Sequence, residues 1–422
     1  MLVKHRQALL SHSATVTEPH IAVHETIAVL ASDGTVHFYA WDKGRWALTT
    51  TFSFRSAQCL SVALSRDAAV VGVPCDYNSR GLITGAAYIF ERDPRSQRWF
   101  QAKKAVPKGV GEYATVGYAV DVCDNVVVVG VPKLGMHGTV DAGGGDGGRV
   151  YAYRRAQPGV WEPMGCLAAA ADAGLVAAAH DPLPSAAAKF GTVVALRAGI
   201  LVVGRHQADR HAKDSTLFVY EYSPAHKGQW RPLQADLLGT EGQRRHFGAP
   251  VALTRDGEGI FVGCRAAVHP AEILFCRRSN RTDAHGNRTF QLQQIITLPE
   301  RCNISDFKMD GNNHSFIVGT LNPNRVYVYR RMHDLSTMED QGWRMMCKVE
   351  DDGSDSQGIE KFGASVGLYG DNVLVGSSNN VYSYSLEGWE IGKKGGKKKN
   401  KQASLNKRKL SFLKTKLSRR SP

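Results

Sequence analysis

The sequence lacks long hydrophobic runs and the signatures of common catalytic chemistry. No run of about eighteen apolar residues occurs, so no membrane-spanning helix is predicted. Lys4, His5 and Arg6 are not followed by an apolar segment, so no signal peptide is expected. The motifs G-x-S-x-G and H-E-x-x-H are absent, as is a Cys–His nucleophile signature, which argues against hydrolase and metalloprotease sites.

Cysteine spacing excludes further classes. The chain has eight cysteines and no C-x-x-C pair, which disfavours zinc ribbons and thioredoxin-like redox motifs. Cys59, Cys123, Cys264 and Cys276 fall on predicted strands, where a thiol acts as a small apolar side chain. The pattern predicts a reduced, intracellular protein.

A helical period of 3.6 residues is also nearly absent, whereas a short strand-like phrase recurs seven times. The phrase is an apolar run that ends in glycine, and its first copy, Val29-Leu30-Ala31, is degenerate. The other six copies end in Gly72, Gly130, Gly204, Gly263, Gly319 and Gly376. Successive intervals of 41, 58, 74, 59, 56 and 57 residues indicate a repeat architecture.

Other features recur in the same order around each glycine. Three copies begin with Phe-Gly, namely Phe190-Gly191, Phe247-Gly248 and Phe362-Gly363, and Val116-Gly117 stands at the same place in another. An alternating aromatic strand follows each run, as in Tyr88-Ile89-Phe90. A large aromatic residue closes each unit, and this set is Trp46, Trp99, Trp161, Trp230, Phe290, Trp343 and Trp389. Each unit therefore reads as four strands bounded by Gly, Asp and Asn turns.

Seven units of four strands predict an all-β fold, a seven-bladed β-propeller of four-stranded antiparallel blades. Small residues on the first strand permit close approach near the central axis, and the closing tryptophan is expected to cover the outer face of its blade. The quoted Phe-Gly and Val-Val-Gly elements resemble the FG-GAP repeat family, known from integrin α chains, over roughly residues 18–391. This resemblance implies a platform for binding rather than an active site.

The chain departs from calcium-binding FG-GAP members in the turns between the first two strands. Those members carry an Asp-x-Asp-x-Asp-Gly loop, which supplies the oxygen ligands that calcium requires. The corresponding turns here, such as Asp124-Asn125 and Gly370-Asp371-Asn372, hold one or two acids and read as plain hairpin turns. No cofactor is predicted, and an integrin-like extracellular role loses support.

Two segments are predicted, a propeller over residues 1–391 and a basic, disordered tail over residues 392–422. The stretch Val3–Leu10 has strand length and no blade of its own, so it is expected to pair with the last blade and close the ring. A frayed terminus is the alternative.

The tail carries almost all of the net charge of +14. From residue 393 onward the chain has thirteen basic residues and no acid, which leaves 40 basic and 39 acidic residues for the propeller. The basic residues are Lys393, Lys394, Lys397, Lys398, Lys399, Lys401, Lys407, Arg408, Lys409, Lys414, Lys416, Arg419 and Arg420.

Three uses of the tail stay open beside a merely solubilising extension. Two basic clusters about ten residues apart look like a bipartite nuclear localisation signal. Lysines also bind RNA or another polyanion without reading its sequence. Leu410, Leu413 and Leu417 stand at helical spacing among basic residues, which suits a helix on RNA, an acidic protein or an anionic membrane.

Several inserted segments could form contact surfaces. The alanine-rich residues 163–189 are expected to form a loop or short helix on the propeller surface. Loops 73–84, 132–147, 205–214 and 264–271 are expected on one propeller face, where a protein partner would bind. His206 and His211 are weak candidates for a metal site, because a polar solvent-facing loop gives the same residues.

The sequence thus predicts a non-catalytic interaction scaffold, taken by its tail to the nucleus or nucleolus or onto RNA. A peripheral membrane or cytoskeletal adaptor is one alternative. A propeller hydrolase or lyase with a pocket in the central channel is the other, because loops of many blades can build such a site.

Overall fold

The computed structural model describes residues 19–32, 34–54, 61–132, 148–168, 189–205, 216–223, 229–238, 246–265, 270–283, 286–309, 314–333, 340–350, 361–378 and 380–386. The chain divides into two units. One unit, Lys4–Ser385, holds every described strand. The other comprises Met1–Val3 and Leu386–Pro422, of which only Leu386 is described.

The described strands form seven separate sheets, which we number as blades 1 to 7 in chain order. Blades 1 and 2 contain β1 (His20–His24), β2 (Ile27–Ser32), β3 (Thr35–Asp42), β4 (Arg45–Ser53), β5 (Ser61–Leu64), β6 (Ala68–Val73), β7 (Ala86–Arg92) and β8 (Trp99–Ala105). Blades 3 and 4 contain β9 (Val120–Cys123), β10 (Val126–Val131), β11 (Arg149–Gln157), β12 (Val160–Ala168), β13 (Phe190–Arg197), β14 (Ile200–Arg205), β15 (Thr216–Ser223) and β16 (Gln229–Gln234). Blades 5 and 6 contain β17 (His246–Leu253), β18 (Gly259–Arg265), β19 (Glu272–Arg278), β20 (Phe290–Thr297), β21 (Asn303–Met309), β22 (Ser315–Leu321), β23 (Arg325–His333) and β24 (Asp340–Glu350). Blade 7 contains β25 (Ser365–Tyr369), β26 (Asn372–Gly376) and β27 (Val381–Ser385).

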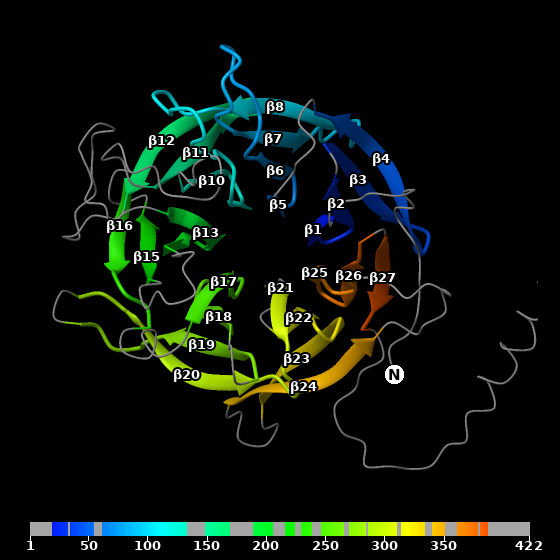
Figure 1. The fold of residues 1–422 in the computed structure, drawn as a ribbon, viewed down its shortest axis with the longest axis vertical. Helices are drawn as coiled ribbons and strands as arrows, with labels where there is room; N and C mark the ends of the chain where they lie inside the picture. The colour runs from blue at the N-terminus through cyan, green and yellow to red at the C-terminus, as the bar shows by residue number, and fades with distance from the viewer. Residues whose placement is uncertain are drawn as a thin grey trace, which may run out of the picture. The chain divides into compact units, whose positions relative to one another are not determined.

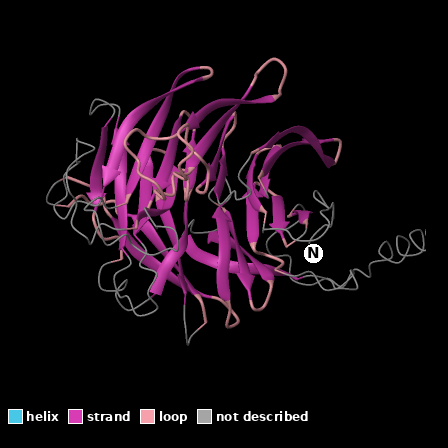
Figure 2. Cartoon of the chain, turned by 45° about the horizontal axis from the view of Figure 1, so that its top comes forward, coloured by secondary structure: helices cyan, strands magenta, loops and turns pink. Residues whose placement is uncertain are grey.

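Each blade is an antiparallel meander whose strands follow chain order from the central axis outward (Figure 1). Figure 2 shows strands and connecting loops, and no helix, in the described part of the chain. Six blades have four described strands and blade 7 has three. The predicted all-β, seven-bladed β-propeller is confirmed.

The repeated glycines have a shared structural reason, which is close approach between neighbouring blades. Gly130 on β10 lies against the backbone of Gly191 in the next blade, and Gly319 lies in the same way against Gly363. A Cβ atom added at either Gly130 or Gly319 would come within 3.0 Å of the facing carbonyl oxygen, where real Cβ atoms are not found. Gly191 and Gly363 have φ values of +91° and +92°, a region that favours glycine. The two halves of the repeated phrase are therefore the two sides of one contact between blades.

In the six blades whose outer strand is described, the aromatic residue near the start of that strand is buried between blades, rather than lying over an outer face as predicted. Trp99 is 4% exposed and stacks on Phe38 of the preceding blade, with ring centroids 4.4 Å apart. Trp343 packs edge-on against Phe261 of blade 5 with centroids 5.0 Å apart. The expectation was wrong because the indole has a large apolar surface, and packing that surface against the adjacent blade removes more of it from water than an outer position would.

Blade 1 packs directly on blade 7, which closes the ring within the described residues. The indole Nε1 of Trp46 donates a buried hydrogen bond of 3.0 Å to Ser383 Oγ. The Ser365 hydroxyl donates to the Pro19 carbonyl oxygen, and Ile21, Leu30 and Leu374 share one apolar cluster. The predicted pairing of Val3–Leu10, and Trp389, lie outside the described residues.

The expected insertion begins later than predicted. Residues 163–168 continue β12, which pairs with β11 as far as the Arg149–Ala168 partners, so they are strand rather than loop or helix. Leu167 and Ala168 are buried, which explains why this apolar start of the segment joins the sheet. Residues 169–188 lie outside the described part of the chain.

Candidate functional site

The two ends of the central channel carry different connections, because neighbouring strands are antiparallel. Hairpins between the first and second strands lie at one end, which we call the hairpin face. Loops 73–84, 132–147, 205–214 and 264–271 each connect a second strand to a third. The described ends of these strands lie at the other end of the channel, which we call the loop face. Only loop 73–84 is described throughout.

Asp76 ties loop 73–84 to its blade through both its backbone and its side chain. Its backbone carbonyl accepts hydrogen bonds from the amides of Thr84 and Gly85, at 3.1 and 2.9 Å. Its carboxylate accepts from the Tyr88 hydroxyl at 2.5 Å and pairs with Lys104 Nζ at 2.8 Å. Asp76 is itself 5% exposed, so this buried carboxylate fixes the loop to strands β7 and β8.

A groove of about 1010 Å³ opens beside this loop. Tyr77 and Phe54 are part of its lining, and Tyr77 is 50% exposed. Lys104 Nζ lies 5.4 Å from the centroid of the Tyr88 ring and also donates to the Tyr77 carbonyl. An exposed aromatic side chain on an ordered backbone, next to a cation, has the chemistry that protein interfaces favour.

At the hairpin face the channel widens into a cavity of about 260 Å³. Its apolar wall comes from the innermost strands and includes Val62, Val120, Val194 and Val251, the β-branched positions of the sequence repeat. The described turns beneath it are tight hairpins: Asp124-Asn125, Ala198-Gly199 and Gly370-Asp371 each join directly paired strand residues. Asp124, Ala198 and Gly370 have positive φ, as expected for such turns.

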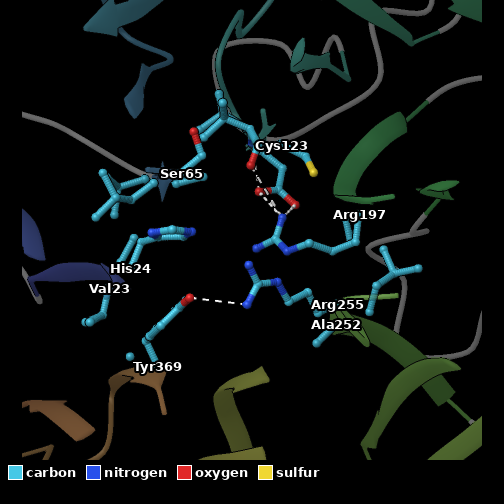
Figure 3. Close-up of a pocket in the computed structure, with 18 of the residues that line it drawn as sticks. Val23, His24, Ser65, Cys123, Arg197, Ala252, Arg255 and Tyr369 are labelled. Atoms are coloured by element: carbon cyan, nitrogen blue, oxygen red, sulfur yellow. Dashed lines mark hydrogen bonds and ion pairs between the residues drawn. The ribbon is translucent and has the colours of Figure 1, made fainter. Parts of the chain in front are cut away.

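Two blades place an ion pair at this mouth (Figure 3). Arg197 at the end of β13 donates from Nη1 to both carboxylate oxygens of Asp121 on β9, at 3.1 Å each. Asp121 also accepts from the amides of Leu196 and Val122, at 2.7 and 2.8 Å. Burial disfavours the charged guanidinium, but the charge and hydrogen bond of Asp121, together with the charges of Cys123 and Asp124, outweigh it and raise the pKa of Arg197. The pair links blade 3 to blade 4.

Three further side chains converge on the same space from other blades. Figure 3 shows His24, Arg255 and Tyr369 directed toward the centre of the cavity, beside Arg197. The Tyr369 hydroxyl accepts a hydrogen bond of 3.3 Å from Arg255 Nη1. The Tyr369 ring lies 4.7 Å from the His24 ring, centroid to centroid. His24 Nδ1 is buried and has no hydrogen-bond partner among the described residues.

The position of His24 predicts a pH-dependent stability. Burial lowers the pKa of His24 to about 4; Glu25 opposes this shift, and Arg197, Arg255 and Arg66 add to it. Since the unfolded chain takes up this proton near pH 6.5, the stabilisation is complete above pH 6.5 and is lost as pH falls toward 4. The unfolding free energy of the natural chain should therefore fall as the pH is lowered over this range, and that of His24→Asn should fall by about 2 kcal/mol less. Urea titrations at pH 7, 5.5 and 4.5 measure it, and equal slopes in both chains would contradict the assignment.

The other predicted site residues are not part of the described structure. His206, His211 and every basic residue of the tail, from Lys393 to Arg420, lie outside it. Among the described residues, no group of three or more His, Cys, Asp or Glu side chains could hold a metal ion. Nor does that part of the chain contain a helix long and apolar enough to cross a membrane. Seven of the eight cysteines are described, and all seven are free thiols.

The chain is thus a seven-bladed β-propeller with two candidate sites. One is the channel mouth at the hairpin face, and the other is the groove beside loop 73–84, next to the outer strands β4 and β8. No protein-family model matches it, and no curated protein does. Among solved structures it is similar to the β-propeller domain of Myceliophteria thermophila Cps50 (Swd1), with a TM-score of 0.54 and 12% identity over 90% of this chain and 99% of that one. A protein from Lactobacillus plantarum is similar at a TM-score of 0.50 and 14% identity, over 78% and 83% of the two chains. At these identities the likeness concerns the fold.

Proposed function

We propose that this propeller is a non-catalytic scaffold that binds a protein partner on its loop face. The observation that carries the proposal is the groove beside loop 73–84, where the half-exposed ring of Tyr77 stands on a loop fixed by Asp76. A loop that is already ordered loses little conformational entropy on binding, which favours recognition by shape. The resemblance to FG-GAP repeats, taken up as part of this proposal, also favours a binding platform.

The chemistry of the channel mouth supports the non-catalytic part of the proposal. Asp121 has its carboxylate engaged by Arg197 and two backbone amides, so it is not available as a general base. Burial raises the pKa of the Cys123 thiol, which keeps it protonated and therefore a poor nucleophile. His24 stays neutral at pH 7 and packs against Tyr369 rather than against a hydroxyl nucleophile.

The basic tail supplies the second half of the proposed function, which is delivery to the nucleus or nucleolus or contact with RNA. Thirteen basic residues without an acid attract phosphates and release counterions, a contribution that needs no folded interface. The nearly neutral propeller would then determine the protein partner, and the tail would determine where the two meet.

Purification of the tagged chain from cells, followed by mass spectrometry, tests both halves. Tyr77→Ala should lower recovery of the propeller's partner by at least about tenfold, since a central aromatic residue contributes about 2 kcal/mol to an interface. When residues 393–422 are removed, nuclear proteins should no longer be recovered with the chain. Proteins that bind through RNA should be lost as well, and these should also be lost from the full chain after nuclease treatment.

Phe100→Ala is the matched control, because Phe100 is a 39% exposed aromatic on β8, away from the loop. An equal loss of partner recovery with Tyr77→Ala and Phe100→Ala would show that the loop face is not the contact surface. Recovery of lipid-associated proteins through the tail would favour the membrane adaptor. If the same proteins are recovered with and without residues 393–422, the role proposed for the tail is wrong.

A further inference from the structure

The channel mouth at the hairpin face combines cationic and neutral hydrogen-bond donors from four blades. Arg197 comes from blade 4, Arg255 from blade 5, Tyr369 from blade 7 and His24 from blade 1. All four side chains are directed into one cavity of about 260 Å³ (Figure 3). Residues so far apart in sequence meet here only because the ring closes.

The arrangement leaves donor groups directed at the cavity. Within the described residues, every hydrogen bond of Arg197 runs from Nη1, so its Nε and Nη2 groups have no protein acceptor there. His24 Nδ1 is covered by protein atoms and has no partner among these residues, so it is not one of the groups that face the cavity. A second guanidinium, that of Arg255, lies beside the first and is bonded to the Tyr369 hydroxyl. Two neighbouring positive charges in a partly enclosed space favour an anion between them.

The charged groups around the cavity are of both signs. Arg66 adds a third positive charge that acts on His24, and Glu25 adds a negative one. Asp121 is the carboxylate that faces Arg197, and its oxygens are already shared among Arg197 and two backbone amides. Asp124 also lines the cavity, and its charge acts on Arg197. The acids and bases named here are therefore equal in number, and what the cavity offers an anion is the Nε and Nη2 donors of Arg197, which Asp121 does not use.

We propose that this mouth binds a small phosphate-type oxyanion, either inorganic phosphate or the phosphoryl group of a small molecule. Guanidinium forks match the geometry of phosphate oxygens, and the imidazole N–H and tyrosine hydroxyl add neutral donors. The cavity volume lies just below that of pockets for drug-sized ligands, which suits a small anion better than a folded partner. This site lies on the face opposite the proposed protein contact and does not depend on it.

Isothermal titration with sodium phosphate and with pyrophosphate, at an ionic strength held constant with chloride, tests the proposal. The intact chain should bind one anion per propeller, and the free anion should raise the unfolding temperature. Arg255→Gln should weaken binding by at least about tenfold, and Tyr369→Phe by a smaller factor, because charged hydrogen bonds are stronger than neutral ones. Arg197 is not substituted, since its pair with Asp121 joins two blades.

Arg281→Gln is the matched control, because Arg281 is an exposed arginine on the turn after β19. Titration of a chain lacking residues 393–422 separates the channel from the basic tail, and its affinity should equal that of the full chain. Equal loss with Arg255→Gln and Arg281→Gln, or no saturable binding at millimolar phosphate, would overturn the proposal. Binding of a glutamate-rich peptide but not of phosphate would overturn it in favour of an inserted acidic side chain. If Arg255→Gln does not fold, the phosphate affinity of Tyr369→Phe is compared with that of Arg281→Gln instead, and equal affinities would overturn the proposal.

Discussion

Substitution of Gly130 by alanine is expected to destabilise the propeller by at least about 3 kcal/mol, although it adds a single methyl group. The new Cβ would lie within 3.0 Å of the Gly191 carbonyl oxygen. Gly130 is paired with Val150 in its sheet, and Gly191 is held between the paired residues Phe190 and Val193 of β13. Backbone cannot move aside as a flexible side chain can, so blades 3 and 4 would have to separate. The change in unfolding free energy is measured by urea titration followed by circular dichroism.

Gly111→Ala provides the control for this substitution. An added Cβ at Gly111 meets nothing within 4 Å, and its φ lies outside the region that favours glycine. This variant should therefore unfold within about 0.5 kcal/mol of the natural chain. Gly319→Ala, which faces Gly363 in the same way, should reproduce the loss. A stability of Gly130→Ala equal to that of Gly111→Ala would show that blade spacing does not depend on these glycines.

The sequence predicted the blades because their determinants repeat. Glycines equivalent to Gly130 and Gly191 occur at related places in every well-preserved unit, and a tryptophan recurs after them. Each blade must separately allow close backbone approach and bury a large aromatic ring, so the same residue types recur at regular intervals along the sequence. The structure then showed what the repetition could not, that Trp99 is buried against the preceding blade.

The channel mouth could not be predicted in the same way. Arg197 and His24 lie at the turn end of an innermost strand. Arginine recurs at this turn in blades 2, 4 and 5, as Arg66, Arg197 and Arg255, whereas His24 and Tyr369 have no counterpart of the same type. Their proximity depends on ring closure and on the direction of each hairpin, which one sequence does not encode as a pattern. A usable signal did exist: the prediction of seven blades puts every first-strand turn at one channel end, so comparing those turns would have brought His24, Arg197, Arg255 and Tyr369 together.

Glu91 is the residue whose loss should most affect the contact between blades 2 and 3. It is 3% exposed, and its Oε1 accepts hydrogen bonds from Trp161 Nε1 at 2.6 Å and from the Gly159 amide at 3.0 Å. Its Oε2 pairs with Arg155, whose side chain is 16% exposed, at 3.4 Å. Glu91→Ala should cost about 3–5 kcal/mol, because it leaves a buried indole N–H and amide without an acceptor and removes one of two carboxylates from Arg155.

Two further substitutions separate burial from charge in this effect. Glu91→Gln keeps an oxygen that can accept from Trp161 and Gly159, so it should recover part of the lost stability, and the remainder measures the ion pair with Arg155. Glu258→Ala removes a shorter ion pair, 2.7 Å to Arg288, and a longer one, 3.8 Å to Arg278. The side chains of Glu258 and Arg288 are more than a third exposed, at 36% and 37%. Solvent screens that pair, so its loss should cost less than about 1 kcal/mol in the same urea titration. A comparable loss at both positions would mean that the blade interface is not stabilised by burial of the Glu91 carboxylate, and that the ion pairs along the ring contribute equally wherever they lie.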